Sequence, residues 1–282
     1  LLQNGFHVIC EKPLTTSFKE AVELVELQKM SKKVFAVTYT YTGYPMIRQM
    51  RDMIKDGAIG RVQKIDAQYF QGWINPIIHD PKSRKSTWRL QPEKSGISCC
   101  IGDIGTHAFD MIEYVSGLKV NSVLSDLNYL YDDNPMDVDG SILIRCEDGV
   151  KGCIRASQIA TAEENSFEVK IYGDKGGLKW EQENPNYLYL LKEGVPMQVL
   201  KPGNTYNSEL SLDGTKLPSG HPEGIFDAMG NIYHGVARAI RQEPHDEGEF
   251  PSITDGLRGM DFIEKVVASH KDGNRWKELT DL

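Results

Sequence analysis

Two short apolar runs near the N-terminus are separated by a segment with its own helix start signal. The runs are residues 7–10 and 34–37. Between them, Ser17 and Glu20 have the spacing of a capping box. Apolar residues then recur at helical intervals, which predicts a helix over about 18–31. A strand, a helix and a strand in this order form a parallel βαβ unit, so the chain is expected to begin in an α/β fold.

The rest of the sequence predicts a different architecture. Asp148-Gly149 lies between the apolar runs 141–146 and 150–156, which is a strong hairpin signal. Further strand-like runs occupy 62–70, 167–172, 178–181, 187–191 and 197–200, and helical patterns occupy 46–55, 103–116, 225–240 and 257–267. Residues 72–98 show no clear period and are predicted to form a long functional loop. The patterns therefore favour an α+β region with a mostly antiparallel sheet.

Composition and charge exclude several classes of protein. The 282 residues include 32 Lys and Arg against 40 Asp and Glu, a net charge of −8. This argues against a general nucleic-acid binder, which needs a basic face. No stretch approaches the ~18 apolar residues that a membrane span requires. The five cysteines form no CxxC pair, so neither a disulfide framework nor a zinc site is expected, and a reducing, cytoplasmic location is predicted. The sequence starts without Met, so its first residues carry no information about export.

Lys12 directly follows the first predicted strand, between Glu11 and Pro13. Ligands bind at the carboxyl ends of strands in parallel α/β sheets, so Lys12 could point into a binding crevice. The motif is short, however, and on this signal alone a solvated loop lysine is the better interpretation.

A second candidate is the segment Gly102-Asp103-Ile104-Gly105-Thr106-His107. On a helix, Asp103 and His107 share a face, and Asp110 extends this polar stripe. A carboxylate one turn from a histidine can orient the ring and raise its basicity. The two glycines suggest that something approaches the backbone closely. Two alternatives stay open: Asp103 caps the helix and His107 packs in the core, or the pair is half of a metal site.

Trp88-Arg89 and Tyr41 are weaker candidates. Arg presents a fixed fork that suits phosphate or carboxylate, and Trp offers a stacking face. Tyr41 follows the second predicted strand, together with Tyr39. Both tyrosines could line a pocket, although plain packing is the commoner role. The sequence has no nucleophile elbow, P-loop or metal-spaced cluster, so no metal is predicted.

These motifs are far more specific together than singly. A strand that ends in Glu11-Lys12-Pro13, followed much later by Gly-Asp-x-Gly-x-His on a helix, resembles the glucose–fructose oxidoreductase / inositol dehydrogenase / rhizopine-catabolism (Gfo/Idh/MocA) family. Trp88-Arg89 and the final helix with Asp255-Gly256-Leu257 look like the same family. The resemblance covers nearly the whole chain.

The resemblance implies a fold and a cofactor. Members have a Rossmann domain that binds NAD or NADP and a substrate domain with a large, mostly antiparallel open sheet. We therefore expect an α/β protein in which residues 1–42 are the C-terminal part of a Rossmann domain. Residues 43–282 are expected to form an α+β domain for substrate binding and oligomerisation. No GxGxxG motif occurs, and the family would place it before Leu1, so most of the Rossmann domain is expected to be missing.

The resemblance also implies roles for the candidate residues. Lys12 would hydrogen-bond the reacting hydroxyl, His107 would be the general base in oxidation and the acid in reduction, and Asp103 would orient the site. Cofactor contacts are implied for Glu11, Lys12, Pro13, Trp88 and Arg89, and substrate contacts for Lys12, Tyr41, Asp103 and His107.

The expected function is NAD(P)-dependent hydride transfer to or from a sugar, a sugar derivative or a cyclitol. Two alternatives remain: a truncated, non-catalytic paralogue that serves assembly, and a redox-neutral NAD-dependent glycosidase. A homo-oligomer (dimer or tetramer) through the open sheet is expected, because a bare sheet would leave an apolar surface exposed. Thr40-Tyr41 and Gly96-Ile97-Ser98 stand where the family often has Asn-Arg and Gly-Gly-Gly, which bears on the identity of the substrate.

Overall fold

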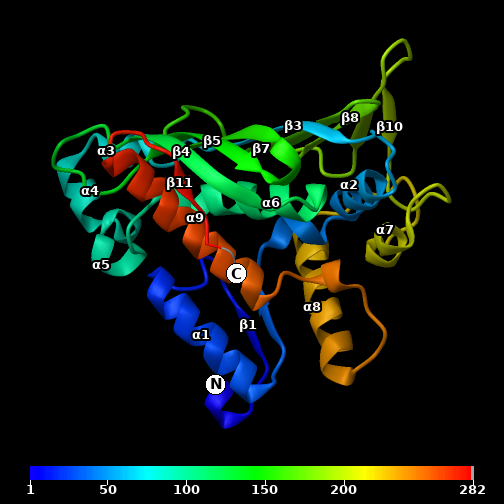
Figure 1. Ribbon diagram of the computed structural model, residues 1–282, viewed down its shortest axis with the longest axis horizontal. Coiled ribbons are helices and arrows are strands. Elements are labelled where there is room, and N and C mark those ends of the chain that lie inside the picture. The colour runs from blue at the N-terminus through cyan, green and yellow to red at the C-terminus, as the bar shows by residue number, and fades with distance from the viewer. Residues whose placement is uncertain (281–282) are drawn as a thin grey trace.

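Two sheets of very different size organise the protein, and the computed structural model describes residues 1–280 (Figure 1). The small sheet holds β1 (Val8–Cys10) and β2 (Phe35–Val37). The large sheet holds β3 (Val62–Phe70), β4 (Val120–Asn128), β5 (Asp139–Cys146), β6 (Lys151–Ser157), β7 (Ser166–Gly173), β8 (Gly176–Glu181), β9 (Leu188–Leu191), β10 (Gln198–Leu200) and β11 (Lys277–Glu278). The α-helices are α1 (Phe18–Ser31), α2 (Pro45–Lys55), α3 (Asn75–Ile78), α4 (Pro81–Ser86), α5 (Pro92–Ser95), α6 (Thr106–Ser116), α7 (Glu209–Gly214), α8 (Ile225–Arg241) and α9 (Ile253–Lys271).

The predicted βαβ unit is confirmed. β1 and β2 pair in parallel, with Val8 opposite Phe35. Helix α1 connects them and begins at the predicted capping box: the Ser17 hydroxyl accepts from the backbone N–H of Glu20, and the Glu20 carboxylate accepts from the backbone N–H of Ser17. Since β1 ends at Cys10, Lys12 lies at the carboxyl end of a parallel strand.

The large sheet is mostly antiparallel, as predicted. Its strand order is β10-β9-β8-β7-β3-β6-β5-β4-β11, and the β3–β6 pair is parallel while its other pairs are antiparallel. The predicted hairpin at Asp148-Gly149 joins β5 to β6. Both turn residues have positive φ angles, 55° and 74°, which Asp and Gly tolerate well.

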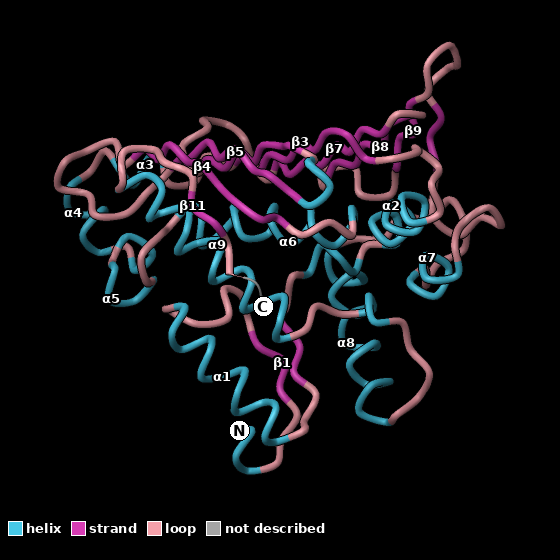
Figure 2. The backbone as a smooth tube through the Cα atoms, in the orientation of Figure 1, coloured by secondary structure: helices cyan, strands magenta, loops and turns pink. Residues whose placement is uncertain are grey.

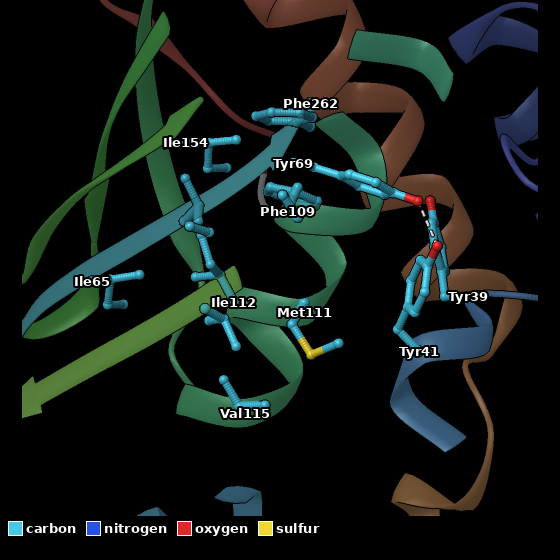
Figure 3. Packing of buried hydrophobic residues seen from close by; sticks show 14 of the residues in the cluster. Tyr39, Tyr41, Ile65, Tyr69, Phe109, Met111, Ile112, Val115, Ile154 and Phe262 are labelled. Atoms are coloured by element: carbon cyan, nitrogen blue, oxygen red, sulfur yellow. Dashed lines mark hydrogen bonds between the residues drawn. The ribbon is translucent and has the colours of Figure 1, made fainter. Parts of the chain in front are cut away.

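One face of the large sheet carries the helices and the other does not (Figures 1 and 2). Helices α2, α6 and α9 lie along the covered face. In β5, Ile142 and Ile144 point to this face and are buried, whereas Leu143 between them is 51% exposed. Under the sheet, the rings of Phe109 and Phe262 stack with centroids 4.4 Å apart (Figure 3). This alternation is that of a sheet with one open face.

Helix α9 connects the two sheets. It packs against α1 and β2 on one side and against β4 and α6 on the other. Its Arg258 forms a buried ion pair with Glu113 of α6, with the closest N···O distance at 2.6 Å. The boundary between residues 42 and 43 stays a prediction. None of the helices within residues 1–280 has the length and apolar character needed to cross a bilayer.

The prediction of a long loop at 72–98 was wrong. This segment contains α3, α4 and α5 and a 3₁₀ turn, η3 (Trp88–Leu90). All three helices have a proline in their first turn, and Asp80 caps α4 by accepting from the backbone N–H groups of Lys82 and Ser83. Helices of this length are too short to show a helical period of apolar residues. Only their start signals, the first-turn prolines and the Asp80 cap, could have predicted them from the sequence.

Candidate active site

Lys12 reaches from the end of β1 to the start of the α6 region. Its ammonium donates to the Asp103 backbone oxygen at 2.6 Å and to the Asp103 Oδ1 at 2.9 Å. The two side chains are only 15% and 19% exposed. An ammonium has three N–H donors, so one remains available for a ligand. The alternative of a solvated loop lysine is therefore excluded.

The Asp103 carboxylate collects donors from three separate segments. Besides Lys12, the Gln158 side-chain amide donates to Oδ2 at 2.8 Å, and Arg89 Nε lies 3.3 Å from the same oxygen. Asp103 therefore does not cap the helix. The turn before it is fixed by Asp137, a fully buried carboxylate that accepts from the backbone N–H groups of Cys99 and Ile101.

His107 lies one turn beyond Asp103, at the start of α6. Within residues 1–280 no hydrogen bond joins the side chains of Asp103 and His107, and the carboxylate is turned toward Lys12, so the role implied for Asp103, to orient the site, stays a prediction. Aromatic rings hold the imidazole instead: those of Tyr41 and Tyr39 pack edge-on, with centroids 4.9 and 5.6 Å away. Burial lowers the pKa of His107 well below its usual 6.5, and the positive charge of Lys12 acts in the same direction. The ring is therefore neutral at physiological pH and able to accept a proton.

Asp110 does not join this site. It lines a separate cavity with Arg51, Glu113 and Asp255, and burial raises the pKa of its carboxyl well above the usual value. Asp110 and His107 both lie in α6, but they face different cavities. The segment before α6 is a π-helical turn, η4 (Ile101–Gly105), in place of the expected α-helical start, so Asp103 does not continue the regular helix that holds His107.

Two adjoining cavities surround these residues. Cavity 1 has a volume of about 430 Å³, and cavity 2 of about 310 Å³. The predicted site residues that line cavity 1 are Glu11, Lys12, Pro13, Trp88, Arg89 and Asp103, and those that line cavity 2 are Lys12, Tyr41, Arg89, Asp103 and His107. All predicted site residues thus lie at one place, and Lys12, Arg89 and Asp103 form the border that both cavities share.

Cavity 1 is lined by the backbone at Gly102 and by the aromatic ring of Trp88. A Cβ on Gly102, which lines this cavity, would meet nothing closer than Ser98 at 3.8 Å, so packing within the chain does not require glycine there. The missing side chain leaves room for a ligand against the backbone, as the sequence suggested. Gly105 has another cause, because its Cβ would crowd Ile101 at 3.1 Å. The Arg89 guanidinium stacks 4.5 Å from the centre of the half-exposed Trp88 ring.

Sequence reasoning missed most of the far wall of cavity 2. Tyr69, Gln71 and Trp73 line it, at alternate positions along the end of β3 and beyond. Tyr69 and Gln71 both donate to the Asn165 side-chain oxygen, at 2.6 and 2.9 Å, and Tyr69 also bonds the Tyr41 hydroxyl (Figure 3). The period-2 spacing of these polar residues was the signal that could have revealed the wall.

One cluster outside these cavities has ligand-type side chains. In residues 1–280, Asp213, His234 and Glu249 place one possible ligand atom each within 4.8 Å of the others. The Arg238 guanidinium already lies 3.0 Å from both carboxylates. A bound cation would have to displace this charge, so the cluster is an ion-pair network.

A parallel βαβ unit, an open antiparallel sheet, a lysine and a carboxylate between two cavities and a neutral histidine in one of them are the features of a nicotinamide-dependent oxidoreductase. Residues 1–39 match the family model described as "Oxidoreductase family, NAD-binding Rossmann fold". Residues 47–179 match the model described as "GFO/IDH/MocA C-terminal domain". The chain belongs to the GFO/IDH/MocA family of NAD(P)-dependent oxidoreductases.

Individual relatives agree with this assignment. The uncharacterized oxidoreductase YfiI of Bacillus subtilis (strain 168) is 31% identical over 286 residues, which span 99% of this chain and 73% of that protein. An oxidoreductase structure from Sinorhizobium meliloti has a TM-score of 0.86 at 36% identity. An inositol dehydrogenase homolog from Azotobacter vinelandii, complexed with NAD+, has a TM-score of 0.90 at 29% identity. Each match covers 98% of this chain and 73% of the solved chain.

Proposed function

We propose that the protein transfers a hydride between a nicotinamide in cavity 1 and a hydroxyl-bearing ring carbon of a sugar or cyclitol in cavity 2. The observation that carries this proposal is the border shared by the two cavities. Lys12 and Asp103 belong to both, so a ring in one cavity and a substrate in the other meet across them. Proximity of this kind supplies a large part of the rate in two-substrate reactions.

The nicotinamide, when bound, supplies the hydride acceptor or donor. Glu11, Pro13, Trp88 and Gly102 would hold its ring in cavity 1. In oxidation, the neutral His107 accepts the hydroxyl proton, and in reduction the imidazolium returns it. The free N–H of Lys12 donates to the reacting oxygen and stabilises the negative charge that develops there. Asp103 fixes this ammonium through its 2.9 Å contact.

The far wall of cavity 2 supports a neutral, hydroxyl-rich substrate. Tyr69 and Gln71 direct N–H or O–H donors at Asn165, and the Trp73 indole donates to the Gln71 side-chain oxygen at 3.1 Å. These donors are used within the wall, so its oxygen atoms can accept hydrogen bonds from substrate hydroxyls. The names of two similar proteins point the same way: the inositol dehydrogenase homolog and the levoglucosan dehydrogenase of Pseudarthrobacter phenanthrenivorans, the latter 31% identical over 206 residues.

The proposal is tested on the natural full-length protein with NAD⁺ or NADP⁺ and a panel of sugars and cyclitols. Formation of reduced nicotinamide in proportion to substrate supports net oxidation, whereas turnover without it supports the redox-neutral alternative. His107→Asn should lower kcat by about 10²–10⁴-fold while NAD(P)H binding persists. Near-normal turnover of this variant would exclude His107 as the base. No turnover by the natural protein on any substrate would favour the non-catalytic alternative.

A homo-oligomer through the open face of the large sheet is part of the proposal. On the open face of this sheet, Leu143 and Tyr172 are 51% and 38% exposed and lie among ion-paired side chains such as Arg155–Asp66 and Lys170–Glu168. Interfaces between subunits combine apolar residues with polar ones in this way. Leu143→Asp should shift the mass in light scattering toward the monomer. An unchanged oligomer in this variant would place the interface elsewhere.

The cytoplasm is the proposed compartment. All five cysteines are free thiols, which is typical of proteins in reducing surroundings. Localisation of the tagged natural protein by cell fractionation tests this directly.

A further inference from the structure

Gln158 is a fully buried polar residue beside the site for which neither the sequence nor the family resemblance suggested a role. It directly follows β6, and its exposed fraction is 0%. Its backbone is held on both sides: its N–H donates to the Val138 carbonyl at 2.9 Å, and its carbonyl accepts from the Ile74 N–H at 3.1 Å. The backbone position from which the Gln158 side chain extends is therefore fixed.

The orientation of the Gln158 amide is also fixed. The Cys99 thiol donates to its Oε1 at 3.3 Å, and its Nε2 donates to the Asp103 carboxylate at 2.8 Å. Burial raises the pKa of the Cys99 thiol, so the thiol keeps its proton and remains a donor. The reversed amide would place a carbonyl oxygen against a carboxylate and lose both bonds. One arrangement is consequently favoured.

Asp103 divides its two oxygens between different partners. Oδ1 accepts from Lys12, and Oδ2 accepts from Gln158 with Arg89 Nε at a longer 3.3 Å. Of these three partners, Gln158 is the one that is fully buried. The side chains of Lys12 and Arg89 are 15% and 36% exposed. Without it, Arg89 alone would hold Oδ2, and the carboxylate would be free to turn away from Lys12.

We propose that Gln158 is a positioning residue that locks the Asp103 carboxylate so that the third N–H of Lys12 points into cavity 2. The proposal rests on the proposed function for its catalytic consequence, but the geometry that it describes is independent of turnover. A misplacement of about 1 Å in such a contact can lower the rate by about 10²-fold. Since a neutral amide provides the lock, it adds no further charge to the site.

Two variants and a matched control test the proposal in the natural full-length protein. Gln158→Leu removes both amide bonds, and Gln158→Glu keeps the shape but faces Asp103 with a second carboxyl group. Gln49→Leu is the control: Gln49 is 4% exposed, its Oε1 accepts from the Ser208 N–H at 2.7 Å, and it lines neither cavity. Each protein is compared in thermal unfolding, in the acetylation rate of Lys12 measured by peptide mass spectrometry, and in steady-state kinetics.

The expected result separates positioning from stability. Gln158→Leu should raise the acetylation rate of Lys12 by about 3–10-fold and lower kcat by about 10–100-fold, with a smaller change in KM. Gln49→Leu should lower the melting temperature by a similar amount without either change. For Gln158→Glu, kcat relative to wild type should recover as the pH falls, because the protonated carboxyl can again donate to Asp103.

Two results would overturn the proposal. One is an unchanged acetylation rate of Lys12 in Gln158→Leu, and the other is the same rise in Gln49→Leu. Since acetylation needs no substrate, these results are distinct from a failure of the proposed function, which would appear as no turnover by the natural protein on any substrate.

Discussion

Replacing His107 by Asn should change how the stability of the protein depends on pH. In the folded protein, burial and the charge of Lys12 lower the pKa of His107 well below the 6.5 of an exposed histidine. As the pH falls through 6.5, the unfolded chain takes up a proton at this position and the folded chain does not. The unfolded state then binds more protons, so the wild-type protein loses stability toward acid pH.

The magnitude follows from linkage. With His107 still neutral in the folded protein, this one group lowers the free energy of unfolding by about 1.4 kcal/mol between about pH 7.5 and about pH 5.5. The His107→Asn variant lacks this term. Its free energy of unfolding relative to wild type should therefore improve by about 1.4 kcal/mol over the same range.

Urea unfolding of both proteins at the two pH values measures this difference. Phe109→Leu is the control, because Phe109 is a buried, non-titrating residue of the same helix. This variant should be destabilised by the same amount at both pH values. If the difference between wild type and His107→Asn does not change with pH, His107 is not held neutral by its surroundings, and the argument for it as a base is refuted.

Three further substitutions test other parts of the structure. Gly102→Ala should weaken NAD(P)H binding by more than about 10-fold in a fluorescence titration while the melting temperature does not fall, because Ala favours helical backbone and its Cβ would project into cavity 1; unchanged affinity would mean that nothing binds against this backbone. Arg258→Met should lower the free energy of unfolding by about 3–5 kcal/mol, because it leaves the buried Glu113 carboxylate without its main partner; a loss below about 1 kcal/mol would show that the pair is dispensable. Ser17→Ala should cost about 1 kcal/mol, measured by urea unfolding, through loss of the capping box of α1, and no loss would mean that the cap is replaced by water.

Local patterns predicted the parts of the fold that depend on neighbouring residues. The capping box of α1 and the Asp148-Gly149 hairpin are examples, because their signals lie within a few residues of the structure that they form. The π-helical turn at Ile101–Gly105 was not predicted. Its shape depends on the Asp137 carboxylate, which comes from a distant segment and has no local signature.

The sequence predicted which residues form the candidate site, but not which of them contact one another. Lys12, Asp103 and His107 were singled out from their motifs, and the structure brings all three to the wall of cavity 2. The pairing of Asp103 with Lys12, in place of His107, could not be read from helical spacing. Gln158 was missed altogether, because a glutamine after a strand is common and its importance comes from the 2.8 Å contact with Asp103.

The central claim is that the border of Lys12 and Asp103 joins a cofactor cavity to a substrate cavity. The most direct measurement uses the natural full-length protein and a sugar or cyclitol that carries deuterium on the reacting ring carbon. The account predicts that deuterium appears in the reduced nicotinamide, detected by mass spectrometry, and that His107→Asn lowers this transfer by about 10²–10⁴-fold. Oxidised substrate with no deuterium in the nicotinamide would contradict direct transfer between the two cavities.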